Sequence, residues 1–389
     1  MPPGQNPFQV STLATGEAFT DRRGEVARIR DAWTTPGAKL VVYGERRLGK
    51  TAALDVAAER ARRAGTKVAL VSLAAAIDLP DAVRRLMTVV HRTVGRSWTT
   101  AIQDIAAKLR LTVTMKPGPE GAALPGLSLS FDPAATAGRP GYFVDALDAI
   151  EAEVARRKLR LGIGIDEFQR LVEWGGQDVE WALKSSLERH RHLSYVFAGS
   201  ARTLIEEMVS SKHRALWKAV DTLAMGPIAP RELAAWIVRR ARATGVRFSD
   251  ETAMAIITLS GPRTRDVVLL AGATWDDAQE HRGRGDPQRA LDAYVGLTDS
   301  LHQRAWDQLT DRERRILRAL AAEPVIELMS QGARERHALG APSTVQTALQ
   351  QLVGEEFLSK HERRFGFDDP FFRRWVGVNT GEDVGGMGR

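Results

Sequence analysis

At 389 residues, 43% of them hydrophobic and 26% charged, the chain is long enough for two or three folded domains and too apolar for wholesale disorder. The absence of cysteine excludes disulfides, thiolate zinc sites and a cysteine nucleophile. A net charge of +7 favours polyanionic partners such as nucleic acid, although a solvated arginine-rich surface would give the same balance.

The first residues, MPPGQNPFQV, lack the basic and apolar runs of a signal peptide. No uncharged apolar segment reaches the roughly 18 residues that a membrane helix needs. We therefore expect a soluble, cytoplasmic protein with no membrane partner.

Strand and helix patterns alternate through the first half of the chain. Short apolar runs predict buried strands at 40–43, 67–73, 159–165 and 193–198. Helical spacing predicts helices at 22–33, 51–64, 81–109, 142–157 and 179–190, and one starting near Thr203. This alternation is typical of a mainly parallel sheet covered on both faces, so we expect residues 1–228 to form a three-layer α/β domain.

Residues 110–133 differ from this pattern. They hold two alternating segments around a turn rich in proline and glycine, MKPGPEGAALPG. We expect an inserted β-hairpin or a mobile loop, and the sequence indicates no role for it.

The stretch GERRLGKT at 44–51 matches the phosphate-loop pattern GxxxxGK[ST] between a predicted strand and a predicted helix. Glycines let the backbone N–H groups point at phosphate oxygens, Lys50 places an ammonium on the β- and γ-phosphates, and the Thr51 hydroxyl coordinates Mg²⁺. The alternative for the whole motif is a chance glycine-rich turn. The alternative for Arg46 and Arg47 is that they are solvated surface charges with no role at the site. The predicted nucleotide-binding residues are Gly44, Glu45, Arg46, Arg47, Leu48, Gly49, Lys50, Thr51 and Ala52.

An acidic pair follows a later apolar strand, in LGIGIDEFQRL at 161–171. Because the carboxyl ends of parallel strands form the ligand crevice, we expect Asp166 to hold Mg²⁺, directly or through water. Glu167 would polarise the attacking water as a general base. The alternative is an acidic helix cap.

Polar and basic residues elsewhere complete the predicted catalytic set of Glu167, Lys50, Ser200 and Arg265. Ser200 ends the strand YVFAG and would bind the γ-phosphate or the attacking water, or simply cap the next helix. Arg265 or Arg263, in GPRTRDV, could bind the γ-phosphate as a second sensor. The alternative for each is an ordinary surface charge. An arginine finger supplied in trans would require a homo-oligomer; Arg202 and Arg214 are candidates.

From Pro230 onward helical patterns dominate. We expect a helical lid at 229–295, a winged-helix domain at 296–378 and a flexible tail at 379–389. In the winged-helix domain, Thr310 caps a first helix, Ser343 is a plausible cap for the helix 342–352, and residues 357–367 form the wing.

The second of these helices has the polar outer face of a recognition helix. The predicted base or phosphate contacts are Thr344, Gln346, Thr347 and Gln350, with the wing residues Lys360, Arg363 and Arg364 on backbone phosphate. Winged helices also dock proteins, and this helix has no arginine, so a protein partner is the alternative to duplex DNA.

The segments of the chain follow the order FTDRRGEV at 19–26, GERRLGKT, IDEFQ, FAGS, lid and winged helix. In this order the chain resembles the archaeal-type ATPases of the STAND class, relatives of the origin-recognition branch of AAA+ ATPases. The resemblance covers about residues 7–378 and implies ATP as the nucleotide, the 19–25 stretch near its adenine, and Ser200 as a γ-phosphate sensor. It predicts slow ATP hydrolysis that controls DNA binding. The alternatives are an ATP-switched regulator with little turnover and a protein-docking ATPase.

Overall fold

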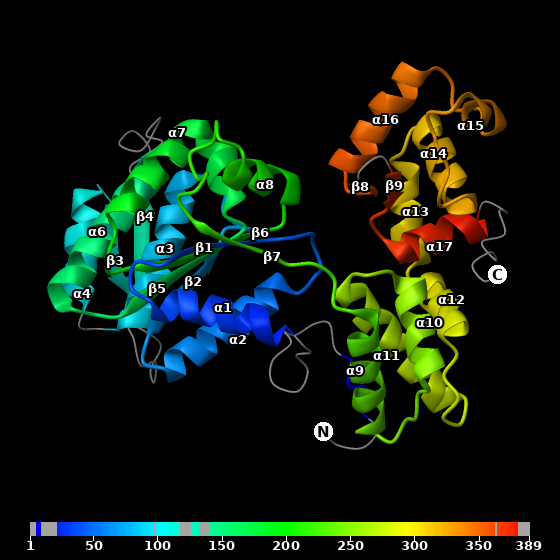
Figure 1. Ribbon diagram of the computed structural model, residues 1–389, viewed down its shortest axis with the longest axis horizontal. Helices are drawn as coiled ribbons and strands as arrows, with labels where there is room; N and C mark the ends of the chain where they lie inside the picture. Colours follow the sequence, from blue (N-terminus) through cyan, green and yellow to red (C-terminus); the bar gives the residue numbers. More distant parts are fainter. Residues whose placement is uncertain are drawn as a thin grey trace. The chain divides into compact units, whose positions relative to one another are not determined.

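The computed structural model describes residues 5–8, 22–95, 98–109, 111–116, 126–131, 141–361 and 364–379. Its backbone divides into two compact units, one of residues 12–228 and one of residues 1–11 with 229–389 (Figure 1). None of the helices in these described ranges is both long enough and apolar enough to cross a membrane.

The unit of residues 12–228 is built on a five-stranded parallel sheet. Its strands, in spatial order, are β2 (Lys67–Ser72), β5 (Leu161–Asp166), β6 (Ser194–Gly199), β1 (Lys39–Tyr43) and β7 (Asp221–Ala224). Every residue of β5 and β6 is buried, which explains why both are apolar apart from Asp166 at the end of β5 and Ser194 at the start of β6. The strand order places the carboxyl end of β6 between those of β5 and β1.

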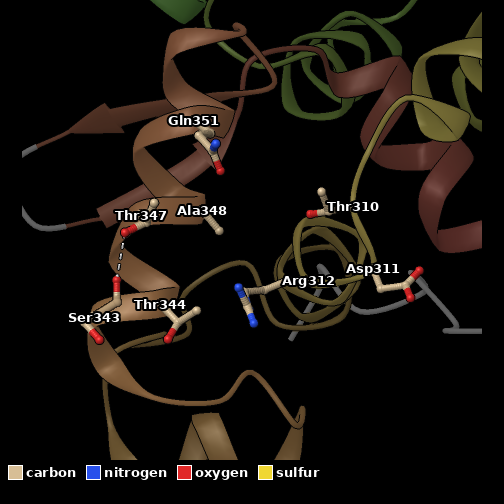
Figure 2. A pocket seen from close by; sticks show the side chains of 8 residues that line it. All are labelled: Thr310, Asp311, Arg312, Ser343, Thr344, Thr347, Ala348 and Gln351. Carbon is tan, nitrogen blue, oxygen red and sulfur yellow. Dashed lines mark hydrogen bonds between the residues drawn. The ribbon is translucent and has the colours of Figure 1, made fainter.

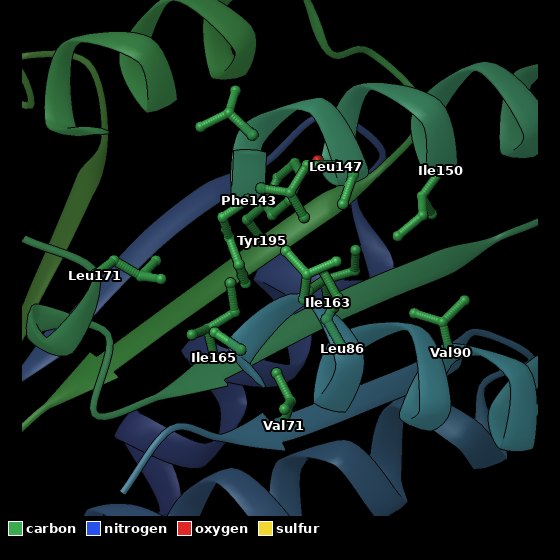
Figure 3. Close-up of a cluster of buried hydrophobic side chains, with 14 of the residues drawn as sticks. Val71, Leu86, Val90, Phe143, Leu147, Ile150, Ile163, Ile165, Leu171 and Tyr195 are labelled. Atoms are coloured by element: carbon green, nitrogen blue, oxygen red, sulfur yellow. The ribbon is translucent and has the colours of Figure 1, made fainter. Parts of the chain in front are cut away.

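Helices cover both faces of this sheet, which confirms the predicted three-layer arrangement (Figure 1). Side chains alternate between the faces: in β6, Tyr195 and Phe197 join the core on one side, and Val196 and Ala198 the core on the other. Figure 3 shows the first of these cores, where Leu86 and Phe143 pack over the strands.

The helices of this unit fall into two sets. One face is covered by α1 (Arg23–Thr34) and α2 (Lys50–Arg63). The other is covered by α3 (Leu79–Val94), α4 (Thr99–Lys108), α6 (Tyr142–Arg157), α7 (Gln169–Arg189) and α8 (Arg202–Ser210).

Three elements differ from the sequence expectation. The helix expected at 81–109 is two helices, α3 and α4, because the chain turns at Gly95 with a φ of 88°. Helix α7 begins at Gln169, ten residues earlier than expected, and bends at Gly176. Strand β7 was not expected, because an edge strand of four residues has no buried apolar run.

The inserted segment contains β3 (Leu111–Lys116) and β4 (Gly126–Phe131), which pair antiparallel. Leu111 pairs with Phe131 and Lys116 with Gly126, the register of a hairpin. Residues 117–125, within the predicted turn, lie outside the described residues.

The second unit is almost entirely helical. Its first helices are α9 (Pro230–Arg242), α10 (Asp250–Ser260), α11 (Thr264–Glu280) and α12 (Pro287–Leu297). The rest comprises α13 (Asp299–Asp307), α14 (Asp311–Ala322), α15 (Gln331–Arg336), α16 (Pro342–Gly354), β8 (Leu358–His361), β9 (Arg364–Phe367) and α17 (Pro370–Asn379). Helices α14 to α16 followed by the β8–β9 wing form the expected winged helix.

The beginning of the chain belongs to this helical unit. Residues 1–228 were expected to form the α/β domain, but Phe8 packs edge-on against Trp236, and Asn6 donates to the Gly272 carbonyl at 3.0 Å. The Arg240 guanidinium also donates to the Pro7 carbonyl. Residues 5–8 therefore pack on α9 and α11; the predicted tail beyond Asn379 lies outside the described residues.

Candidate nucleotide site and nucleic-acid face

The phosphate loop needs glycine at two positions for different reasons. A Cβ at Gly44 would lie 2.2 Å from the Met225 carbonyl oxygen, so only glycine permits this approach of the two backbones. Gly49 has a φ of 88° and immediately precedes α2, where a side chain would be strained. The loop is thereby held against the segment after β7 and leads into the N-terminus of α2.

Lys50 is the first residue of α2 and is almost fully buried. Its ammonium donates to the Gly44 carbonyl at 2.8 Å and to the Glu45 carbonyl, both in the loop. Burial lowers its pKa to about 8, although the carboxylates of Glu167 and Asp166 act in the opposite direction. Added negative charge would stabilise this partly desolvated cation.

The next residue of α2 meets the acidic end of β5. The Thr51 hydroxyl donates to Asp166 Oδ2 at 2.9 Å, across 115 positions of sequence. Burial raises the pKa of Asp166, while the Thr51 hydrogen bond lowers it. A hydroxyl and a carboxylate that converge in this way fit Mg²⁺, which takes a few protein oxygens and completes its shell with phosphate and water.

Glu167 stands beside this pair in the left-handed conformation, with a φ of 56°. Its backbone N–H donates to Asp166 Oδ1 at 3.0 Å, and its own Oε2 accepts from Ser200 Oγ at 2.8 Å and Gln169 Nε2 at 2.5 Å. Ser200 is therefore hydrogen-bonded to Glu167, the predicted general base. Arg46, predicted as a nucleotide-binding residue with solvated charge as the alternative, lies with its Nε 3.4 Å from Ser200 Oγ.

Two residues of this site were missed by sequence reasoning. Arg22 is buried, and its guanidinium donates to the carbonyls of Leu48 at 2.8 Å and Gly226 at 2.7 Å, which ties the phosphate loop to the segment after β7. The signal was present in FTDRRGEV, of which residues 19–21 lie outside the described part. Gln169 has no motif of its own in the sequence, because its role depends on the hydrogen bond that it donates to Glu167 two residues earlier.

The remaining predicted residues of the loop differ in how far they are buried. Leu48 is buried, Glu45 and Arg47 are half-buried, and Ala52 lies in the first turn of α2. Arg47 has a φ of 65°, so the loop contains a left-handed residue besides Gly49.

The candidate arginines differ in their surroundings. Arg214 is buried and pairs with Glu180 at 2.6 Å and Glu207 at 2.7 Å, so it is a structural residue and not a free arginine finger. Arg202 pairs with Glu206 at 2.9 Å and lies 3.4 Å from Glu45 of the phosphate loop.

The two lid arginines also differ. Arg263 is buried and pairs with Asp368 of the winged helix, donating to both its carboxylate and its carbonyl. Its guanidinium is thus bound within the helical unit, which argues against Arg263 as the phosphate sensor. Arg265 is exposed in the first turn of α11.

The predicted nucleic-acid face lies on α16. Gln346, Thr347 and Gln350 are exposed and Thr344 is half-buried, while Val345, Leu349 and Leu352 face the core as expected. The N-cap is Ala341 and Pro342 opens the helix, so Ser343 lies within the first turn and is not the predicted cap. Helix α16 has no charged side chain.

A polar groove separates α16 from the N-terminus of α14 (Figure 2). Arg312 projects from α14 toward Thr344, whereas Asp311 points the other way. The groove is lined by Thr310, Asp311, Arg312, Ser343, Thr344, Thr347, Ala348 and Gln351.

The arginines of α14 differ in their partners. Arg314 donates to the Trp306 carbonyl, Arg315 donates to the Ala338 carbonyl, and Arg318 lies over the Trp306 ring. Arg312 has no side-chain partner among the described residues, so it supplies a cation beside the neutral α16.

The wing contributes further positive charge. Lys360 is exposed on β8, with its ammonium 5.8 Å from the centre of the Phe365 ring. Arg364 is exposed at the start of β9. Arg363 lies outside the described residues.

Comparisons with known proteins agree with this architecture. A Walker-type ATPase of Pyrococcus abyssi superposes with a TM-score of 0.60 at 14% identity, covering 95% of this chain and 99% of that one. The ORC2 protein of Aeropyrum pernix, solved as ADPNP–ADP complexes, gives 0.58 at 15% identity and 97% of each chain. A search of curated proteins found no match.

A family model described as "Probable winged helix domain" matches residues 300–377. This match covers α14 to α16 and the wing. The chain therefore has the fold of these archaeal Walker-type and ORC2 proteins: an α/β phosphate-loop unit, then a helical region, then a C-terminal winged helix.

Proposed function

We propose that the protein binds Mg-ATP at the phosphate loop, hydrolyses it slowly, and uses the nucleotide state to control duplex-DNA binding by the winged helix. The contact that supports this most strongly is the 2.9 Å hydrogen bond between Thr51 and Asp166, with the buried Lys50 ammonium beside them. A hydroxyl, a carboxylate and an ammonium in this arrangement match the needs of a metal-bound triphosphate.

Each residue has a distinct task in this proposal. The amides of residues 44–52 and Lys50 bind the phosphates, and Thr51 and Asp166 would hold Mg²⁺, which neutralises phosphate charge when bound. Glu167 accepts a proton from the attacking water. At the same time the water oxygen bonds to the γ-phosphorus, and the bond between that phosphorus and the ADP leaving oxygen breaks. Ser200 and Gln169 orient the Glu167 carboxylate.

The choice of adenine rests on likeness. The ORC2 protein of Aeropyrum pernix was solved with ADPNP and ADP, and its fold covers 97% of this chain. Arg265 remains the candidate lid sensor for the γ-phosphate, and a homo-oligomer would be needed for an arginine supplied in trans.

Transmission to the winged helix uses contacts inside the helical unit. Arg263 of the lid pairs with Asp368, Arg374 pairs with Asp292 at 2.7 Å, and Tyr294 packs on Phe371 with ring centres 4.8 Å apart. Because these contacts fasten α17 to the lid, we infer that a nucleotide-driven movement of the lid also moves the winged helix.

DNA contact would involve α16 and the cations around it. Gln346 and Gln350 offer amide groups for base edges, and Thr344 and Thr347 offer hydroxyls. Arg312, Lys360, Arg363 and Arg364 would bind backbone phosphate. The neutral surface of α16 supports a second candidate, in which this face docks a protein.

The test combines turnover with DNA affinity in three nucleotide states. We expect ATP hydrolysis that stops when EDTA removes Mg²⁺, and an affinity for duplex DNA that differs between ATP, ADP and no nucleotide. Turnover without any DNA binding at low salt would favour the protein-docking candidate. Equal DNA affinity in all three states would contradict nucleotide control.

A further inference from the structure

A second groove lies on the α/β unit, remote from the phosphate loop. It is formed by the C-terminal parts of α1 and α2 and by the residue that precedes β5. Its lining consists of Arg30, Thr34, Arg60, Arg63, Ala64 and Arg160. Four arginines thus surround one groove, and no acidic side chain is among these lining residues.

The topology separates this groove from the nucleotide site. Helix α2 begins at Lys50 and ends at Arg63, so at 1.5 Å per residue its two ends are about 20 Å apart. Arg160 immediately precedes β5, whereas Asp166 ends that strand. The arginine groove therefore lies near the amino-terminal end of β5, whereas the nucleotide site lies at its carboxyl end.

Two of its four guanidinium groups have acidic neighbours. Arg30 pairs with the adjacent Asp31, and Arg63 pairs with Glu59 at 3.1 Å on an exposed surface. Arg60 and Arg160 are exposed and have no ion pair or side-chain hydrogen bond among the described residues.

Helix electrostatics explain only part of this arrangement. Basic residues in the last turn of α2, including Arg60 and Arg63, complement the negative end of its dipole. That reason does not apply to Arg160, which comes from a different segment. Like charges brought to one groove repel each other, so a bound polyanion would stabilise the cluster.

We propose that this arginine groove binds the phosphate backbone of duplex DNA, as a second contact in addition to the winged helix; the choice of DNA rests on the proposed function. Arginine binds phosphate through paired N–H groups, and the Thr34 hydroxyl adds a neutral donor. A lipid surface would also need apolar side chains beside the cations, and Ala64 is the single apolar residue of the lining.

The test uses the full chain and a labelled duplex. Arg60→Gln with Arg160→Gln removes the two unpaired cations, and Arg28→Gln with Arg92→Gln on exposed positions outside the groove gives the same change in net charge. Binding followed by fluorescence anisotropy from about 50 to about 200 mM salt gives the number of phosphate contacts. Unchanged ATP affinity shows that each variant is folded.

We expect the groove variant to bind at least tenfold more weakly at low salt and its log–log salt slope to fall by about 2, with little change in the control pair. A groove variant with wild-type slope, while Gln346→Ala with Gln350→Ala loses affinity, would overturn the groove alone. Loss in the groove variant without loss in the α16 variant would instead overturn DNA reading by the winged helix.

Two other results would overturn the assignment of DNA to the groove. One is an absence of duplex binding by the wild-type chain, which would contradict both proposals. The other is wild-type DNA affinity in the groove variant together with lost binding to vesicles containing phosphatidylglycerol, which would assign the groove to an anionic membrane surface.

Discussion

The phosphate loop and the exposed face of α16 are both polar, but their polar groups are held differently. In the loop, Lys50 bonds to two carbonyls and Thr51 bonds to Asp166. On α16, the Gln346 and Gln350 side chains have no partner among the described residues. The phosphate loop is thus organised by contacts within the chain, whereas the proposed partner surface on α16 leaves its hydrogen-bonding groups to solvent.

This difference predicts different responses to mutation. Removing a group from an organised, partly desolvated site leaves its partners unpaired, so the effects should be large. Removing one side chain from the α16 surface should give smaller, graded effects that depend on salt.

The largest effect is expected at Glu167, the proposed general base. Glu167→Gln keeps the shape and the contact with Ser200 but removes the proton acceptor, so steady-state ATP hydrolysis should fall by about 10²–10³-fold. ATP affinity, measured by calorimetry, should change little. An unchanged hydrolysis rate would show that turnover does not depend on this carboxylate.

The second-largest effect is expected on the stability of the helical unit, when the ion pair between the lid and the winged helix is removed. Arg263→Ala removes the buried ion pair with Asp368, and the free energy of unfolding of the helical unit should fall by about 2–3 kcal/mol. Tryptophan fluorescence during thermal unfolding reports this through Trp306 and Trp375. The exposed neighbour Arg265→Ala is the control; an equal effect of both variants would show that the ion pair stabilises nothing.

The pH dependence of nucleotide binding tests the environment of Lys50. Its pKa is lowered to about 8, so the free protein loses this proton as pH rises, while bound phosphates would hold the ammonium charged. ATP affinity should therefore fall about tenfold from about pH 7 to about pH 9. Calorimetry in two buffers should show proton uptake above pH 8, and a flat affinity profile would contradict this account.

The smallest effect is expected beside α16. Arg312→Gln removes one unpaired cation, so the salt slope of duplex binding should fall by about 1 and affinity severalfold. The exposed lid residue Arg242→Gln provides the matched loss of charge. Identical slopes for the two variants would remove Arg312 from the DNA face.

Much of the α/β unit was predictable because its signals are local. GERRLGKT and the strand ending in Asp166 are short motifs, and buried parallel strands are continuous apolar runs. Because the strands are parallel, the carboxyl ends of β1 and β5 lie on the same side of the sheet, which brings Thr51 to Asp166.

Other features depend on partners distant in sequence. Arg22 bonds to a carbonyl 204 positions away, and Arg263 pairs with a residue 105 positions away. The packing of residues 5–8 on α9 and α11 has the same character. A single sequence does not show which distant residues will be in contact. An arginine that stabilises the fold therefore cannot be distinguished, from sequence alone, from one that binds a ligand.

Nucleotide binding itself tests the central claim most directly. Calorimetry with Mg-ATP should show binding by the wild-type chain, a loss of about 100-fold or more in Lys50→Ala, and no change in Lys212→Ala, which alters an exposed lysine. ATP affinity that is equal in all three proteins would contradict the assignment of the phosphate loop as the nucleotide site.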